Sequence, residues 1–211
     1  MTTTSIRRAA LAFAVGAAGT ALSGAVVQLA VQPTTDVPDD RWSYPWTPGT
    51  FVVVTALFAL LHLLITVGLV AFRRSGATGP SRAGRTGTAL AVVGTLLLTL
   101  AELASIPIRD AAMDDASAGA VGALFGLGTL ISAVGLLLAG RATLSAGVWQ
   151  GWQRYTPLVA GVWTMILLGV SFTKALPGGV GVYGLLLLAT AVALYTQPAP
   201  VTAPPLVAAR R

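Results

Sequence analysis

Long apolar runs separated by short polar segments dominate the pattern of this chain. A helix needs about 20 predominantly apolar residues to cross the hydrocarbon core of a bilayer, and six runs reach roughly that length. The pattern predicts an all-α polytopic membrane bundle that forms one domain, residues 1–211, and ends in a flexible cytoplasmic tail, residues 196–211. The six predicted transmembrane helices cover residues 9–31, 51–72, 88–108, 118–139, 156–173 and 179–195.

The charges between the predicted spans fall into two unequal groups. With six spans, alternate loops lie on opposite sides of the membrane, and the side that holds most Arg and Lys is the cytoplasm. We therefore predict that both termini are cytoplasmic. Ten basic residues fall on that side: Arg7, Arg8, Arg73, Arg74, Arg82, Arg85, Arg141, Arg154, Arg210 and Arg211. The outer side receives Arg41, Arg109, Lys174 and the six aspartates.

Composition narrows the class further. Only 9% of the residues are charged, so the net charge of +6 indicates membrane topology rather than a nucleic-acid-binding surface. The absence of Cys excludes disulfides and thiol chemistry. The heavy use of Arg, Ala and Gly indicates a bacterial protein, and hence the plasma membrane. Arg7 and Arg8 before the first apolar run resemble a secretory signal, but the run is long enough to remain as a signal anchor.

Two ionisable residues lie inside the predicted spans, His62 and Glu102, and they are the only His and the only Glu of the chain. Ionisable groups in hydrocarbon are costly, which makes them the first candidates for a functional site. At 1.5 Å per residue, His62 is expected about 16 Å below the outer end of its span and Glu102 about 9 Å below. Neighbouring helices could bring the two side chains together. A carboxyl group in such surroundings suits a general acid or a proton carrier.

Polar side chains accompany both residues at helical spacing. In the second span Thr55 and Thr66 share a face with His62, and in the third span a longer stripe surrounds Glu102. We expect the two stripes to line a water-accessible cleft that opens outward, near Pro107. An alternative is a purely structural Glu102, satisfied by hydrogen bonds between helices or paired with Arg109. For His62 the alternative is a structural histidine that donates to a backbone carbonyl. The stripe of the third span consists of Thr88, Thr95, Thr99, Glu102, Ser105 and Arg109.

Aromatic and small residues predict contacts with lipid and between helices. Trp42, Tyr44 and Trp46 precede the second span, as expected for residues at the headgroup level, and Trp149, Trp152 and Tyr155 could share one face of an interfacial helix. Small residues on the first and fourth spans favour close packing within the chain, with a homo-oligomer as the alternative. These small residues include Gly16, Thr20, Ser23 and Gly24, and then Gly122, Gly126 and Thr129.

No cofactor or metal ion is expected. A transition metal prefers three or four His, Cys or acidic ligands, and the chain has a single His and no Cys. The loop of residues 109–115 carries three aspartates that could hold Mg²⁺ and a diphosphate. Their order differs from that of the aspartate-rich prenyl-diphosphate motif, and an ordinary solvated loop is the favoured interpretation. Phosphate loops and nucleophile elbows are absent from the sequence.

The segment Asp40-Arg41-Trp42-Ser43-Tyr44-Pro45, followed by Phe58, His62 and Ala101-Glu102-Leu103, resembles a group of small actinobacterial membrane proteins. The resemblance covers about residues 36–110 and implies no particular activity. In being short, polytopic, free of cysteine and without a metal motif, the chain is also similar to the integral membrane terpene cyclases of natural-product biosynthesis. Those enzymes typically have seven spans and paired acids, whereas six spans and one buried acid are predicted here.

The sequence leaves three functions open. The first is a membrane enzyme, an isomerase or lyase, that cyclises a lipophilic, isoprenoid substrate. In it Glu102 is the general acid, His62 tunes it, and Trp42, Tyr44, Trp46, Phe58, Thr95, Thr99 and Arg109 bind the substrate. The second is a proton-coupled transporter or transporter subunit. The third is a non-catalytic membrane partner. The lipid bilayer is an expected partner in all three, and nucleic acid in none.

Overall fold

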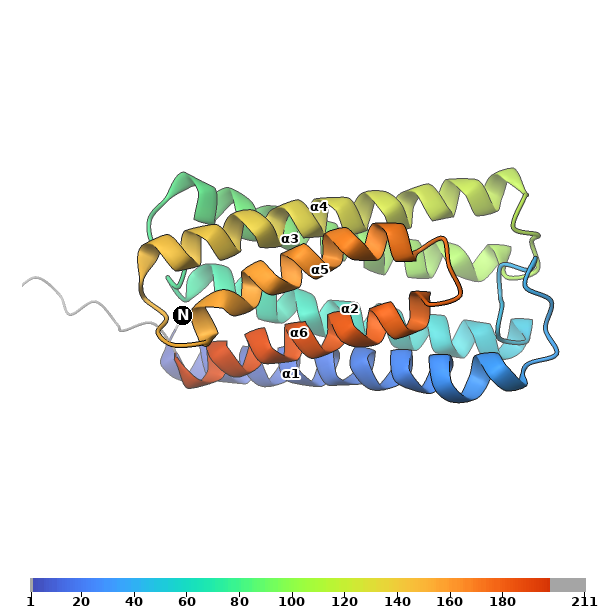
Figure 1. Cartoon of the computed structure of the whole chain (residues 1–211), viewed down its shortest axis with the longest axis horizontal. Coiled ribbons are helices and arrows are strands. Elements are labelled where there is room, and N and C mark those ends of the chain that lie inside the picture. The colour runs from blue at the N-terminus through green and yellow to red at the C-terminus, as the bar shows by residue number, and fades with distance from the viewer. Residues whose placement is uncertain (1, 198–211) are drawn as a thin grey trace, which may run out of the picture.

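The computed structural model describes residues 2–197, and within them the chain is all-helical, without β-strands. Six α-helices follow one another as an up-and-down bundle (Figure 1). A π-helical turn, Val27–Val31, and a short 3-10 helix, Gln32–Thr34, extend the first of them. The helices are α1 Thr3–Val26, α2 Pro48–Arg74, α3 Arg82–Ser105, α4 Ala116–Ala146, α5 Thr156–Val170 and α6 Leu176–Thr196.

The helices form a closed ring in chain order. Each helix packs against its neighbours in the sequence, and α6 returns to pack against α1. In Figure 1 the helices run side by side along the long axis, with α1 and α6 next to each other and α4 on the opposite side. Large buried side chains fill the bundle between the helices, among them Phe13, Ile65, Leu136, Tyr183 and Leu187. The short connections produce this antiparallel arrangement, because consecutive helices have no room to cross over.

Local sequence signals explain where the helices begin and end. Thr47 and Ser81 stand before α2 and α3, and their side chains accept hydrogen bonds from the backbone N–H groups of the first turn. Pro48 and Pro157 occupy the first turns of α2 and α5, where a missing N–H costs nothing. Gly147 ends α4 with φ of 62°, a left-handed conformation that glycine adopts without strain.

Five helical segments are long and apolar enough to cross a membrane. They are residues 3–34, 48–74, 82–108, 116–146 and 176–196, and each contains one of the predicted spans. The remaining predicted span, residues 156–173, corresponds to α5, which has 15 residues and ends at Val170. At 1.5 Å per residue α5 is about 22 Å long, against a hydrocarbon core of about 30 Å. The predicted tail begins in the last turn of α6, and its residues 198–211 lie outside the described residues.

Glycines let three pairs of helices approach closely. A methyl group at Gly24 of α1 would collide with the backbone of Pro177 and Gly181 in α6, and one at Gly87 of α3 would collide with α4. Gly161 of α5 meets the α4 backbone in the same way. Small residues permit this approach and so strengthen van der Waals contact between helices in lipid. The predicted packing role of the small residues on the first span is confirmed at Gly24 and at Gly16, which contacts α2. For Gly122 and Gly126 on the fourth span the prediction of packing within the chain is wrong, because an added methyl group at either would meet no atom within 4 Å.

Trp149 does not lie on an interfacial helix, and this part of the prediction is wrong. It lies in the loop after α4, where it is fully buried, and its ring centroid lies 5.2 Å from that of Phe72. Its indole Nε1 donates to the backbone carbonyl of Gln197 at 3.0 Å. Trp152 and Tyr155 remain exposed. Gly147, with its left-handed backbone, ends the helix before Trp149. The spacing of three residues between Trp149, Trp152 and Tyr155 therefore does not put them on one helical face.

The charged residues gather at the two ends of the bundle. We call one end the arginine end, because α1 begins there and eight arginines lie there: Arg7, Arg8, Arg73, Arg74, Arg82, Arg85, Arg141 and Arg154. At the opposite, aspartate end lie the six aspartates together with Arg41, Arg109 and Lys174. The grouping predicted from alternate loops is thus reproduced by the fold for every described residue.

Candidate functional site

The bundle brings His62 and Glu102 together. Nδ1 of His62 lies 3.9 Å from Oε1 of Glu102, and their side chains are 9% and 14% exposed. The two residues come from α2 and α3, which are neighbours in the ring. We refer to them below as the buried pair.

Helix geometry explains how residues at different depths meet. The Cα–Cβ bonds of a helix tilt toward its N-terminus, and α2 and α3 run in opposite directions. The His62 side chain therefore leans toward the aspartate end, while that of Glu102 leans toward the arginine end. The two side chains therefore tilt toward each other. This reduces the difference of about 7 Å in depth between His62 and Glu102 that the helical rise predicts. His62 lies near the midpoint of α2, 14 residues after Pro48 and 12 before Arg74.

The buried pair differs from the other polar groups of the two stripes. Five stripe hydroxyls donate to carbonyls four residues earlier in their own helices: Thr66 to His62, Thr88 to Gly84, Thr95 to Ala91, Thr99 to Thr95 and Ser105 to Ala101. By contrast, Nδ1 of His62 is buried and has no hydrogen-bond partner among the described residues. These hydroxyls are satisfied within their own helices, which is a structural role. Neither His62 nor Glu102 lines the cavity at the aspartate end, so the cleft between the two stripes stays a prediction.

A pair of this kind can move a proton. The separation of 3.9 Å exceeds hydrogen-bond length, so a small rotation of either side chain is needed before the two atoms share a proton. Arg109 does not neutralise Glu102, because its Nε lies 3.5 Å from the carboxylate of Asp110 instead. Phe58 lies one turn before His62 on α2 and is partly buried, so it stands on the same side of the helix. Thr99 and Thr95 are buried on α3, one and two turns before Glu102.

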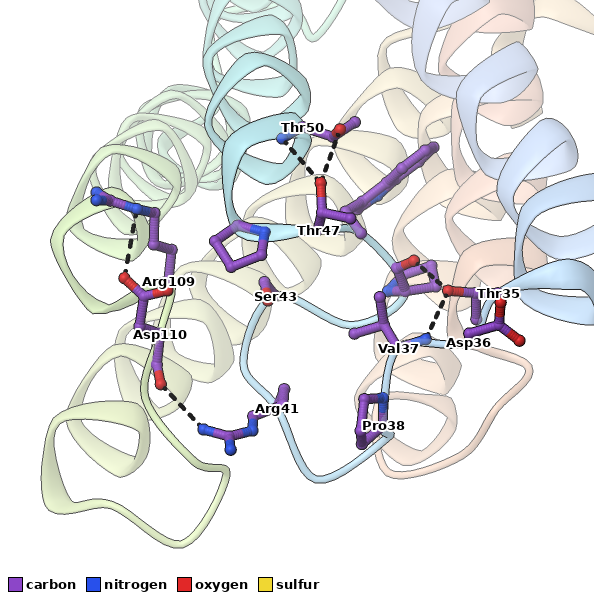
Figure 2. Close-up of a pocket in the computed structure, with 13 residues that line it drawn as sticks. Thr35, Asp36, Val37, Pro38, Arg41, Ser43, Thr47, Thr50, Arg109 and Asp110 are labelled. Carbon is purple, nitrogen blue, oxygen red and sulfur yellow. Dashed lines mark hydrogen bonds and ion pairs between the residues drawn. The ribbon is translucent and has the colours of Figure 1, made fainter.

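The other predicted site residues lie at the aspartate end, away from the buried pair. Trp46 and Arg109 line a cavity of about 670 Å³, which we call the outer cavity (Figure 2). Trp42 and Tyr44 belong to the same loop, and the indole Nε1 of Trp42 is buried without a hydrogen-bond partner among the described residues. The thirteen lining residues are Thr35, Asp36, Val37, Pro38, Arg41, Ser43, Pro45, Trp46, Thr47, Pro48, Thr50, Arg109 and Asp110.

Three loops meet at the aspartate end. Backbone hydrogen bonds join the loop before α2 to the loop after α3: Trp42 N–H donates to Ala111 at 3.0 Å and Met113 N–H donates to Asp40 at 2.7 Å. Lys174, in the loop before α6, lies 2.9 Å from Asp39. Its hydrogen bond and its charge lower the pKa of Asp39, and the carboxylate in turn raises the pKa of Lys174. These contacts hold together loops that lie far apart in the sequence, and no local sequence pattern predicts them.

Sequence reasoning missed several of these features. The outer cavity is lined by Thr35, Asp36 and Arg41, none of which was predicted as a site residue. The only sequence signal for a structured loop there is its content of Pro and aromatic residues. The aromatic side chains of the core, Phe13 and Tyr183, were hidden among apolar residues of long spans. In residues 2–197 no group of three or more His, Cys, Asp or Glu side chains is placed to hold a metal ion.

Comparison with known proteins adds no relative from which a function could be transferred. No family model, no curated protein and no solved structure matches this chain. The buried pair and the outer cavity are therefore the features from which a function can be inferred.

Proposed function

We propose that this chain is a membrane-embedded enzyme that cyclises a lipophilic, isoprenoid substrate, with Glu102 as the general acid. The observation that carries the proposal is the distance of 3.9 Å between Glu102 and His62 inside an apolar bundle. A carboxyl group and an imidazole are expensive in hydrocarbon. Side chains retained there at such cost, facing each other, suit proton transfer to a substrate that is itself apolar.

The reaction needs no group beyond these side chains. Glu102 gives its proton to an alkene carbon of the substrate, so the O–H bond breaks, a C–H bond forms and a carbocation remains. A second alkene of the same molecule attacks the cation and closes a ring. The resulting cation loses a neighbouring proton to the imidazole of His62. A small rotation closes the gap of 3.9 Å, transfer of that proton to the carboxylate restores Glu102, and the product is an isomer of the substrate.

The aromatic side chains have a defined role in this proposal. Phe58, one turn from His62, can stabilise a nearby cation through its ring face. Trp42, Tyr44 and Trp46 lie in the loop at the aspartate end, where they can guide an apolar substrate toward the bundle.

The test is an isomerisation assay on protein reconstituted in lipid nanodiscs. Linear polyprenyl alkenes and their terminal epoxides are supplied, and products of unchanged mass but altered retention are sought by gas chromatography and mass spectrometry. We expect Glu102→Gln to lower the rate by about 10²-fold or more, and His62→Gln to lower it as well. Asp114→Asn, an exposed acid at the aspartate end, is the matched control. Absence of isomers with the wild-type protein, or full activity of Glu102→Gln, would refute the proposal.

A proton-coupled transporter is the second candidate, and the depth of the buried pair favours it. His62 lies near the middle of α2, and transporters place their coupling sites near the bilayer midplane. Trp149 fills the bundle at the arginine end, while the outer cavity lies at the other end. Under this proposal liposomes that contain the protein take up protons when a gradient is imposed, and Glu102→Gln abolishes the uptake. Equal uptake by both proteins removes the candidate.

A third candidate is a non-catalytic membrane partner that associates with a second copy of itself through α4. Gly122 and Gly126 on α4 meet no atom within 4 Å of an added Cβ, so this pair is not used for packing within the chain. Two α4 helices could therefore approach closely along it.

The orientation proposed here has six spans, with the arginine end in the cytoplasm of a bacterial cell and the aspartate end outside. The unequal distribution of arginine supports it. The absence of Cys makes a direct test simple. In intact cells an impermeant maleimide should label Asp114→Cys and leave Ser145→Cys unlabelled. The opposite result would reverse the topology.

A further inference from the structure

The outer cavity is lined by side chains of opposite charge, and one of each sign has no ion-pair partner among the described residues. It is lined by two arginines and two aspartates, so its formal charge is balanced. Arg109 and Asp110 satisfy each other, with Nε and Oδ2 3.5 Å apart. Arg41 uses one of its N–H groups, which donates to the backbone carbonyl of Asp110 at 3.4 Å. Asp36 and Arg41 form no ion pair within residues 2–197.

The two available charges stand apart across the cavity. Figure 2 shows Arg41 close to Asp110, and Asp36 beside Thr35 on the opposite side. A guanidinium has five N–H donors, and Arg41 keeps four of them for a ligand. The carboxylate of Asp36 provides acceptors alone. A ligand that satisfies both must carry an anionic group at one end and a cationic group at the other.

The remaining lining fits a small ligand that is partly apolar. The lining also includes the indole of Trp46 and the rings of Pro38, Pro45 and Pro48. An indole attracts an ammonium group over its face. The hydroxyls of Ser43 and Thr50 add hydrogen-bonding capacity on the same lining.

The loop around the cavity also has the aromatic residues typical of the headgroup level. It is at the end of the bundle where α2 begins, and its loop contains Trp42, Tyr44 and Trp46. Trp and Tyr concentrate at the level of the headgroups. The backbone bonds between the two loops and the bond from Thr35 Oγ1 to the Pro45 carbonyl, 2.7 Å, hold the walls in place before a ligand arrives. Preorganisation of this kind reduces the entropy lost on binding.

We propose that the outer cavity binds a zwitterionic phosphoethanolamine group, with its phosphate on Arg41 and its ammonium on Asp36 and Trp46. The group comes either from phosphatidylethanolamine of the surrounding membrane or from a soluble phosphodiester. A diphosphate fits poorly, because its several negative charges would face Asp36 and Asp110 in a cavity of balanced charge. The binding proposed here does not require proton transfer at Glu102, so Glu102→Gln should bind this group like the wild type.

The test is binding to purified protein in nanodiscs of phosphatidylglycerol. Soluble glycerophosphoethanolamine is titrated while tryptophan fluorescence is followed, and Trp46→Phe identifies the reporting residue. In a second arm, native mass spectrometry measures which lipid stays bound after extraction from an equal mixture of phosphatidylethanolamine and phosphatidylglycerol. Saturable binding in the first arm identifies a soluble ligand, and selective retention of phosphatidylethanolamine in the second identifies a lipid.

Variants decide whether the named residues are responsible. Arg41→Gln and Asp36→Asn should each weaken binding about tenfold or more, because each removes a charge-assisted contact. Asp114→Asn and Arg85→Gln, which do not line the cavity, are the matched controls. The swapped variant Arg41→Asp with Asp36→Arg should recover part of the affinity. The proposal is overturned if neither arm shows binding, if glycerophosphate binds as well as glycerophosphoethanolamine, or if the two single variants bind like the wild type.

Discussion

Replacement of Trp149 should destabilise the bundle far more than replacement of Trp152, although the sequence gives the two residues similar surroundings. Trp149 is fully buried, stacks near Phe72 and donates a hydrogen bond to Gln197, whereas Trp152 is 53% exposed. Truncation of a buried Trp to Ala costs about 3–5 kcal/mol. We therefore expect Trp149→Ala to lower the free energy of unfolding by about 4 kcal/mol and Trp152→Ala to lower it by less than about 1 kcal/mol.

A third variant separates the two contributions of Trp149. Trp149→Phe keeps a ring beside Phe72 but loses the donor to the Gln197 carbonyl. Its cost should be about 1–2 kcal/mol, which is the size of a lost hydrogen bond with an unpaired acceptor left behind. Pulse proteolysis across a series of dodecyl sulfate fractions in mild detergent micelles measures all three. Equal destabilisation by Trp149→Ala and Trp152→Ala would show that the loop after α4 does not close the arginine end of the bundle.

Three further predictions follow from the packing and the charges. Gly24→Leu should prevent α1 from docking against α6 and reduce the yield of folded protein, whereas Gly122→Leu should leave folding intact and reduce only self-association, as size-exclusion chromatography can measure. In a double-mutant cycle of unfolding free energies, His62→Leu and Glu102→Leu should be non-additive by at least about 0.5 kcal/mol, because the two side chains are in contact; strict additivity would separate them. The Asp39–Lys174 ion pair should hold its two loops together at neutral pH and release them as pH falls through the lowered pKa of Asp39 or rises through the raised pKa of Lys174. The release is measured as a loss of protection against hydrogen exchange at the amides of residues 171–175, relative to the intrinsic exchange rate at each pH. In Lys174→Gln this protection should no longer depend on pH.

The helices were predictable because lipid imposes a simple rule. Every backbone polar group in hydrocarbon must be satisfied within its own segment, so a long apolar run has one good conformation. The spans around His62 and Glu102 follow from this rule. So does the gathering of arginine at one end, since alternate loops of an up-and-down bundle must lie together. The length of α5 was overestimated, because Ser171 and Thr173 are compatible with a helix in composition although the helix ends at Val170.

The site was predictable only in part. His62 and Glu102 were predicted because each is an isolated ionisable residue in an apolar run. The distance between them was not predictable, because it depends on the rotation of α2 and α3 about their axes relative to each other. The outer cavity was out of reach for another reason. It arises where loops far apart in the sequence meet, as in the hydrogen bond between Trp42 and Ala111. The burial of Trp149 likewise depends on Gly147, whose left-handed conformation turns the chain back into the bundle.

The contact between residues 62 and 102 is the basis of the proposed chemistry, and cysteine crosslinking in native membranes tests it most directly. The chain has no Cys, so His62→Cys with Glu102→Cys introduces the only two thiols. A short bifunctional thiosulfonate should join them within one chain. The matched control is His62→Cys with Leu103→Cys, because Leu103 follows Glu102 directly and is 49% exposed on the outside of α3. Efficient crosslinking of the first pair and little of the second is the predicted result. Equal crosslinking of both pairs, or none of the first, would contradict it.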